Sequence, residues 1–356
     1  MYPPDKCPLA PSVLPVYVDD LIPMGNKELT DEFETHIGEY FEVTVLGDAS
    51  HFLGIRILRD RLQQNLTLDQ LEFTDLILDQ FAGTSLKETN NPVTPNTNYI
   101  SSDEECNPDK RKFYQRVIGS IMYLMLGTRP DLAFAVGLFG RFCSNPSKAH
   151  MDGLGHLLGY IKATRGCYIK YGTPSSGVDL VPTGYTDSDF AGDLEKRKST
   201  SGYVFFLSGA AFSWRSRLQD TVASSTMEAE YIALHHASQN AVWIRNFFDQ
   251  LGFGLTAPLT IYCDNQPAIN VAQGEVPHKK AKHFEVKLHA VRDHLQRRLT
   301  EVEYVPSEDN QADIFTKPLT KNSFRNSAIG LGICSLPSTP DPDVTSDSLY
   351  VDATDL

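Results

Sequence analysis

Apolar residues in the first half of the chain recur mostly at helical spacing, interrupted by short strand-like runs. Leu29, Phe33 and Ile37 illustrate the spacing, because positions three or four apart share one face of an α-helix. The pattern predicts helices over 28–40, 71–81, 113–126, 128–142 and 147–164, and strands over 51–57, 65–68 and 167–171. In 14–22, apolar residues flank Asp19 and Asp20, which predicts a hairpin with both acids at its tip.

The second half predicts a mixed sheet flanked by helices. Apolar runs predict strands over 178–186, 202–207, 211–215, 259–263 and 301–305. Helical spacing predicts helices over 226–251, 265–272 and 282–298, and a last one through 312–315. Pro182 counts against a strand over the first part of 178–186, because proline lacks an amide donor. The polar, proline-containing stretch 83–107 predicts a linker between the halves.

Composition and charge narrow the function classes. A chain of 356 residues with 41% hydrophobic and 22% charged residues is long enough for two or more domains. The formal net charge is −13, whereas most nucleic-acid-binding proteins carry a basic surface. The five aspartates of 340–356 leave −8 on the rest, so contacts to nucleic acid would need local basic patches. No apolar run approaches the ~18 residues that span a bilayer, and 1–5 does not resemble a signal peptide, so we expect no membrane association.

Four acids lie at predicted element ends or first helical turns: Asp187, Glu228, Asp264 and Asp313. They lie 36 to 49 residues apart, so only tertiary folding could bring them together. Clustered carboxylates repel one another unless cations lie between them. Two Mg²⁺ ions ~4 Å apart would supply that charge, one activating a water and the other stabilising the leaving oxygen of a phosphodiester. A chain with 45 acids also places some at element ends by chance, so a metal site is one of two readings.

Three neighbouring acids are expected to lie outside this set. Asp189 and Asp193 are interpreted as loop acids near the site. Glu230 lies two residues after Glu228, about 200° around a helix, and is therefore expected not to bind the same metal.

Ten short blocks, in order, resemble the C-terminal part of copia-type retrotransposon polyproteins. Tyr17-Val18-Asp19-Asp20 resembles the reverse-transcriptase Y-x-D-D motif. The other blocks are Phe52-Leu53-Gly54-Ile55, Gly119-Ser120-Ile121-Met122-Tyr123-Leu124, Thr128-Arg129-Pro130-Asp131, Gly184-Tyr185-Thr186-Asp187-Ser188-Asp189, Lys198-Ser199-Thr200-Ser201-Gly202-Tyr203, Ser213-Trp214-Arg215-Ser216, Glu228-Ala229-Glu230-Tyr231, Asp264-Asn265-Gln266 and Ala312-Asp313-Ile314-Phe315-Thr316-Lys317. The last six resemble a type-I ribonuclease H domain, and the resemblance runs from about 16 to 319.

The resemblance implies an α/β (α+β) organisation in four segments. It implies a truncated reverse-transcriptase palm and thumb remnant over 1–90 and a helical connection over 91–177. A ribonuclease H-like five-stranded mixed sheet flanked by helices would cover 178–320, followed by an acidic, disordered tail over 321–356.

The same resemblance implies the chemistry and its limits. Asp187, Glu228, Asp264 and Asp313 match the D-E-D-D carboxylates of ribonuclease H, which hold two Mg²⁺ ions, with Mn²⁺ as an alternative. The expected reaction is cleavage of the RNA strand of an RNA–DNA hybrid, leaving a 3′-hydroxyl and a 5′-phosphate. The polymerase is expected to be inactive. Its first palm acid and fingers lie upstream of the Y-x-D-D hairpin, and only 16 residues precede it here. Asp19 and Asp20 would then be two ligands of a truncated, poorly ordered polymerase site.

The expected partner is the RNA–DNA hybrid, with the rest of a polyprotein if the element is expressed. Candidate phosphate contacts are Lys196, Arg197, Lys198, Arg215, Lys282 and His283. Solvated surface charge is the equally good alternative for them. The resemblance places the protein inside the cell, in a virus-like particle or the nucleus if the element is active.

Two other functions compete with the nuclease. The chain could be a non-catalytic retrotransposon relic that at most binds nucleic acid. An integrase or transposase core also uses clustered carboxylates, but that class has its Glu last, whereas Glu is second here.

Overall fold

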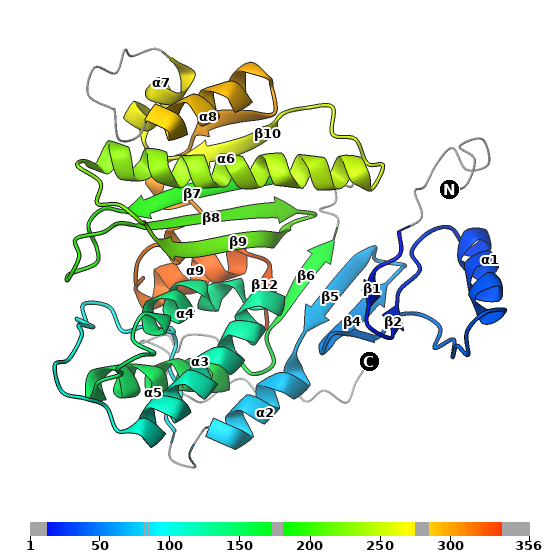
Figure 1. Cartoon of the computed structure of the whole chain (residues 1–356), viewed down its shortest axis with the longest axis horizontal. Helices are drawn as coiled ribbons and strands as arrows, with labels where there is room; N and C mark the ends of the chain where they lie inside the picture. Colours follow the sequence, from blue (N-terminus) through cyan, green and yellow to red (C-terminus); the bar gives the residue numbers. More distant parts are fainter. Residues whose placement is uncertain (1–12, 82, 84–85, 173–180, 275–284, 337–356) are drawn as a thin grey trace, which may run out of the picture.

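The computed structural model describes residues 13–81, 83, 86–172, 181–274 and 285–336. Within this part of the chain there are two five-stranded sheets, a two-stranded hairpin and the helices packed against them (Figure 1). The first sheet has the order β11-β10-β7-β8-β9. Its strands are β7 (Thr183–Asp189), β8 (Thr200–Leu207), β9 (Ala210–Leu218), β10 (Leu259–Cys263) and β11 (Thr300–Tyr304).

This sheet is mixed, and its centre is β7. β10 runs parallel to both β7 and β11, whereas β8 runs antiparallel to β7 and β9. β7 begins directly after Pro182, as expected for a residue without an amide N–H. Cys263 is the register partner of Thr186, so Asp264 and Asp187, the next residues along the chain, lie at the same end of the β7–β10 pair, although β7 continues to Asp189 beside β8. The predicted mixed α/β fold with a five-stranded sheet is confirmed.

One face of the first sheet is covered by α6 (Thr226–Gln250), which crosses in front of it in Figure 1. All of 229–235 is buried, and from Ser238 on the buried residues of α6 recur every three or four positions, as expected for a helix packed along one side. The face consists of Leu234, Ala237, Ala241, Ile244 and Phe248. These residues form one hydrophobic core with β10, α7 (Gln266–Gln273) and α8 (Glu285–Gln296).

The second sheet, with the order β12-β6-β5-β4-β3, collects strands from three distant parts of the chain. They are β3 (His51–Phe52), β4 (Ile55–Asp60), β5 (Asn65–Asp69), β6 (Tyr168–Gly172) and β12 (Ile333–Cys334). The strand predicted over 51–57 is in fact a tight hairpin. Leu53 and Gly54 have φ angles of 50° and 68°, so the chain turns between β3 and β4.

A helical layer packs against both sheets. It consists of α2 (Leu71–Phe81), α3 (Pro108–Gly127), the 3₁₀ turn η1 (Pro130–Leu132), α4 (Ala133–Gly140), α5 (Lys148–Ala163) and α9 (Lys321–Gly330). One hydrophobic core joins these helices to residues of both sheets, including Ile169 of β6, Val204 of β8 and Ala211 of β9. The part of the chain that holds the first sheet therefore shares its core with the rest of the chain.

The expected disordered tail over 321–356 is wrong for 321–336. Phe324, Leu331 and Ile333 are buried, and β12 pairs antiparallel with β6 through Ile333↔Ile169 and Cys334↔Tyr168. The physical reason is that the apolar residues Phe324, Ala328 and Leu331 recur at helical spacing here, whereas the aspartates of this segment begin at 341. Residues 337–356 lie outside the described residues.

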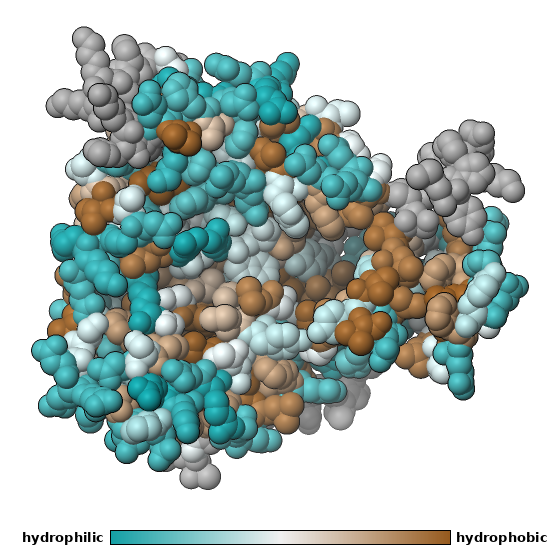
Figure 2. Space-filling view, viewed as in Figure 1, coloured by the Kyte–Doolittle hydropathy of each residue, from teal (hydrophilic) through white to brown (hydrophobic). Residues whose placement is uncertain are grey.

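The predicted N-terminal hairpin is confirmed. β1 (Val16–Tyr17) pairs with β2 (Asp20–Leu21), and α1 (Lys27–Gly38) follows. Asp19 and Asp20 are exposed at the tip. Val16, Tyr17 and Val18 are 60%, 55% and 81% exposed, and Figure 2 shows hydrophobic surface over this end of the molecule. None of the described helices is both long and apolar enough to cross a membrane.

Candidate active site

Asp187 is the most deeply placed acid of the site. It lies near the end of β7 and is only 3% exposed. The hydroxyl of Thr316 donates to its Oδ2 atom. The buried Asn310 donates from Nδ2 to Thr186 O at 3.0 Å and accepts from Ala312 N at 3.1 Å. These contacts tie the end of β7 to the turn that carries the last acid of the motif.

The Glu residue that α6 directs at this edge is Glu230, not Glu228. Glu230 is 6% exposed, and its Oε1 accepts from Ser188 N at 3.2 Å. Its carboxylate interacts electrostatically with those of Asp187 and Asp264. Glu228 instead accepts from Ser224 N at 2.9 Å and from the Ser224 hydroxyl. It sits in the first turn of α6 as a capping residue.

The expectation that Glu230 faces away from the site is therefore wrong, and the helix itself explains why. The two glutamates do lie on different faces, about 200° apart. Counting back from Ala241 and Ala237 in steps of three or four along the buried face leads to Leu234 and then Glu230. All of 229–235 is buried, so the burial pattern alone does not single out Glu230, whereas its contact with Ser188 N does.

Asp264 follows β10 and lies beside Glu230. Ligand atoms of Glu230, Cys263 and Asp264 all lie within 4.8 Å of one another. Ser307 Oγ donates to Asp264 Oδ2 at 2.6 Å, which orients the carboxylate from the loop after β11. The parallel pair β7 and β10 thus supplies Asp187 and the residue after β10, Asp264, and α6 supplies Glu230.

Asp313 begins the 3₁₀ turn η3 (Asp313–Phe315), a shorter element than the predicted helix. Its Oδ1 lies 2.9 Å from Lys317 Nζ, and the same ammonium lies 3.9 Å from Asp187 Oδ2. Lys317 was not singled out in the sequence, although it ends the Ala312–Lys317 block. The structure thus brings together Asp187, Asp264 and Asp313 as predicted for the site, with Glu230 in the place expected for Glu228.

The electrostatics of this cluster suit a bound hard cation. Burial raises the pKa of Asp187 to about 6, with Lys317 opposing the rise and Asp313 adding to it. Burial, followed by the charges of Asp187 and Asp264, raises the pKa of Glu230 well above its usual value. Glu230 Oε2 is buried and has no hydrogen-bond partner among the described residues. Oxygen ligands of this kind fit Mg²⁺, whereas burial raises the pKa of the Cys263 thiol and keeps it a poor ligand.

The raised pKa of Asp187 predicts a pH dependence of stability in the metal-free protein. The folded state holds this proton up to a pH of about 6, whereas the unfolded state releases it near 3.8. Stability should therefore fall as the pH rises from about 4 to about 6, by at most about 3 kcal/mol from this group. Thermal melting in EDTA across this range measures the fall. Asp187→Asn should flatten it, and an unchanged slope in that variant would contradict the assignment.

Two further acids lie near the site without joining the cluster. Burial raises the pKa of Asp189, which Lys317 opposes. Asp193 forms an ion pair with Arg141 at 3.3 Å, between the loop after β7 and the end of α4. Asp193 lies in the loop after β7, as expected, whereas Asp189 is the last residue of β7 and pairs with Thr200 of β8, so its interpretation as a loop acid is wrong.

The predicted basic contacts are dispersed around the first sheet. Lys196, Arg197 and Arg215 are exposed, and Arg197 has a φ of 52° in its turn. Lys198 donates from Nζ to Asp220 O at 2.5 Å. Lys282 and His283 lie outside the described residues, so their predicted role stays untested.

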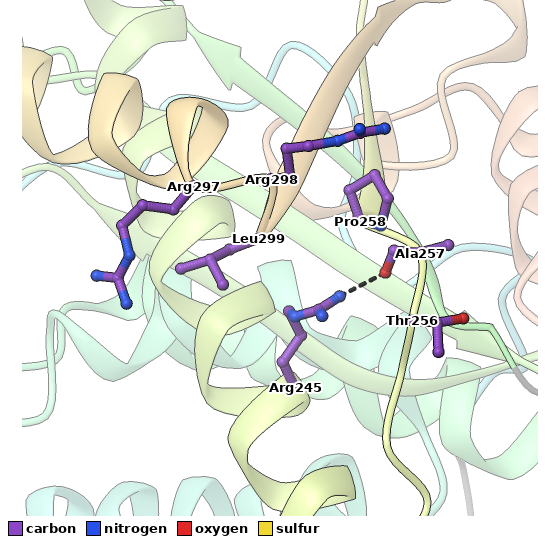
Figure 3. A pocket seen from close by; sticks show the side chains of 7 residues that line it. All are labelled: Arg245, Thr256, Ala257, Pro258, Arg297, Arg298 and Leu299. Atoms are coloured by element: carbon purple, nitrogen blue, oxygen red, sulfur yellow. Dashed lines mark hydrogen bonds between the residues drawn. The ribbon is translucent and has the colours of Figure 1, made fainter.

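A separate hollow lies at the opposite ends of β10 and β11. Figure 3 shows it lined by Arg245, Arg297 and Arg298, with Pro258 and Leu299 at the starts of the two strands. Arg245 donates to the carbonyl of Ala257, so its guanidinium holds the loop before β10. In Figure 3 the three arginine side chains point in different directions, so they do not converge on one ligand position. The hollow is therefore not part of the carboxylate cluster.

Comparisons with known proteins find relatives over most of the chain. No protein-family model matches it. The chain is 34% identical over 318 residues to the retrovirus-related Pol polyprotein from transposon TNT 1-94 of Nicotiana tabacum, covering 88% of this chain and 24% of that protein. It is 33% identical over 331 residues to the one from transposon RE1 of Arabidopsis thaliana, covering 90% and 22%. It thus spans about a quarter of the length of these curated relatives. A solved structure, LC11-RNase H1 in complex with an RNA/DNA hybrid, is 19% identical with a TM-score of 0.31, covering 38% of this chain and 93% of that one.

Proposed function

Because this chain belongs to the retrovirus-related Pol polyproteins of copia-type retrotransposons, we propose that it cleaves the RNA strand of RNA–DNA hybrids in a metal-dependent reaction. The observation that carries the proposal is the convergence of three carboxylates from three elements. Glu230 of α6 interacts with Asp187 of β7 and with Asp264 after β10. A structural role alone would not favour three acids crowded in a buried position, since their repulsion is unfavourable without cations.

Some residues of the cluster would hold the metal ions, and others orient the carboxylates that do so. Asp187, Glu230, Asp264 and Asp313 would hold two Mg²⁺ ions, and Mn²⁺ would serve as a substitute. When bound, the ions supply an activated water and stabilise the leaving oxygen of a phosphodiester. Thr316 and Ser307 orient the carboxylates of Asp187 and Asp264 through their hydroxyl donors.

Phosphate contacts to the hybrid would come from the exposed cations near the sheet. We propose Lys196, Arg197 and Arg215 for this role, because their side chains are exposed. Lys198 is a weaker candidate, since its ammonium already donates to Asp220 O.

We propose no polymerase reaction for the hairpin acids. Asp19 and Asp20 are exposed, and among the described residues neither belongs to a group of three ligand-type side chains. A palm site needs a third carboxylate beside them.

Cleavage of a labelled RNA–DNA hybrid by the full chain tests the proposal. The full chain is the right material, because the first sheet shares a core with the N-terminal helices. We expect cleavage with Mg²⁺ and none with EDTA. Asp264→Asn should reduce the rate by about a hundredfold, because it removes one metal-binding oxygen. Double-stranded DNA of the same sequence is the control substrate. Hybrid cleavage that survives Asp264→Asn would contradict the assignment of Asp264 to the metal site.

The second candidate function is a non-catalytic relic. None of the described residues of the carboxylate cluster supports it. Calorimetric titration of the full chain with Mg²⁺ separates the two. A relic that has lost the site would bind no ion, whereas the nuclease would bind ions that Asp187→Asn removes.

A further inference from the structure

Lys317 occupies a position in the carboxylate cluster that its sequence block does not explain. It lies four residues after Asp313, and its side chain turns back so that Nζ is 2.9 Å from Asp313 Oδ1. The same atom is 3.9 Å from Asp187 Oδ2. One ammonium therefore lies between two carboxylates that come from β7 and η3.

The rest of the cluster lacks such a cation in the described part of the chain. Glu230 and Asp264 lie with Cys263 within 4.8 Å, and the hydrogen-bond donors to the two carboxylates there are neutral groups, Ser188 N and Ser307 Oγ. The site thus has two unlike halves. One half, Asp187 and Asp313, is already neutralised in part by Lys317, and the other half is not.

An ammonium and a divalent ion compete for the same kind of position. Both are stabilised by carboxylate oxygens, and an ammonium adds three N–H donors on a flexible stem. A divalent ion shared by Asp187 and Asp313 would meet the positive charge of Lys317 at close range. Lys317 is 39% exposed, so its side chain has solvent into which it can swing.

We infer that Lys317 is a tethered cation that occupies one metal position in the metal-free protein and moves aside when a divalent ion binds between Asp187 and Asp313. This inference rests on the proposed metal site and adds to it an ordering of the ions. The half with Glu230 and Asp264 fills first, and the half with Lys317 fills at higher ion concentration. Lys317 thereby keeps the empty site folded and sets the affinity of the weaker ion.

Calorimetric titration of the full chain with Mg²⁺ and with Mn²⁺ tests the ordering. We expect the wild-type protein to show a stronger and a weaker binding event. Lys317→Met should lower the Kd of the weaker event by at least about tenfold, because the competing charge is gone. Lys317→Arg keeps the charge and should leave that Kd near the wild-type value. Lys321→Met, which removes an exposed lysine four residues further on at the start of α9, is the matched control.

Thermal melting separates competition from a merely structural ion pair. Lys317→Met should lower the melting temperature in EDTA, where Asp187 and Asp313 lose their counter-charge, and not in saturating Mg²⁺. Equal losses in both conditions, or an unchanged Kd for the weaker ion, would overturn the inference. Absence of any ion binding by the wild-type protein would instead overturn the metal site itself.

A measurement on the wild-type chain covers the case in which Lys317→Met does not fold. Acetylation of lysines by a mild reagent, followed by mass spectrometry, reports how available each amine is. Mg²⁺ should raise the acetylation of Lys317 several-fold and leave that of Lys321 unchanged. No increase at Lys317 under ion-saturating conditions would contradict displacement.

Discussion

Replacing Glu230 with Gln is expected to lower the rate of hybrid cleavage by about a thousandfold, because a metal position is worth several kcal/mol of transition-state stabilisation. Glu230 is buried and faces both Asp187 and Asp264, so no other described side chain can take its place. Glutamine keeps the shape and can still accept from Ser188 N, but it carries no charge for an ion. Steady-state cleavage of a labelled hybrid at saturating Mg²⁺ measures the loss.

Glu228→Gln is the matched control for this prediction. The two glutamates are separated by one residue on the same helix, and Glu228 accepts from Ser224. We expect the Glu228 variant to cleave at close to the wild-type rate, with a loss of unfolding free energy of about 0.5 kcal/mol from the weakened cap. If Glu228→Gln abolished cleavage and Glu230→Gln did not, the assignment from geometry would be wrong and the sequence-based one right.

Glu230→Gln should also stabilise the metal-free protein. The raised pKa of Glu230 means that its ionised form is unfavourable in the folded state, so stability falls as the pH rises and the group ionises. Removing this charge should raise the unfolding free energy by about 1 kcal/mol in EDTA near neutral pH. Melting of both glutamate variants in EDTA tests it, since only the Glu230 variant should gain stability.

Asp131→Asn is expected to cost 3–5 kcal/mol of unfolding free energy, roughly the loss found when one partner of a buried ion pair is removed. Arg129 and Asp131 are each 1% exposed, with Nη2 and Oδ2 2.8 Å apart. Tyr160 donates its hydroxyl to Asp131 at 2.6 Å, and Arg129 donates to Thr164 Oγ1 at 2.7 Å. Asparagine would leave the guanidinium buried beside a neutral group. Denaturant unfolding of the full chain measures the change.

An exposed pair supplies the control for this loss. Lys148 and Asp152 form an ion pair at 2.8 Å on α5, with side chains 89% and 65% exposed. Asp152→Asn should change the unfolding free energy by less than about 0.5 kcal/mol, because water screens the pair. Replacing Arg129 and Asp131 together with Met and Leu should cost much less than Asp131→Asn alone, since no charge is then left unpaired. Equal losses in the single and double variants would contradict the ion-pair explanation.

Strands β8 and β10 were predictable because each contains an apolar run with turn residues beside it. Asp187 and Asp264 could be expected near strand ends, but only the parallel pairing of β7 with β10 brings them to one end of the sheet. Glu230 was misjudged because the sequence favoured the acid in the first helical turn, and only tertiary contacts with Ser188, Asp187 and Asp264 identify Glu230. Lys317 and Asn310 act through tertiary contacts, to which periodicity gives no clue.

The second sheet was predictable only in part. The hairpin of β4 and β5 is long enough to be recognised from its alternating apolar and polar residues. β12 has only two residues and is a strand because it pairs with β6. Leu53 has a φ of 50°, in the left-handed region that residues with a branched side chain disfavour. A turn at this position therefore could not be predicted from the sequence. The conformation of short strands and strained turns is determined by the elements that they pack against.

The pairing of β12 with β6 also governs the order in which this chain can assemble. Residues 169 and 333 meet in one sheet although the whole first sheet lies between them in sequence. During synthesis from the N-terminus, the edge of β6 stays open until 333–334 has left the ribosome, while β7 to β11 can already pair. Such distant closure slows folding and leaves an unpaired strand exposed in the meantime. The last step of assembly is then the docking of α9 and β12.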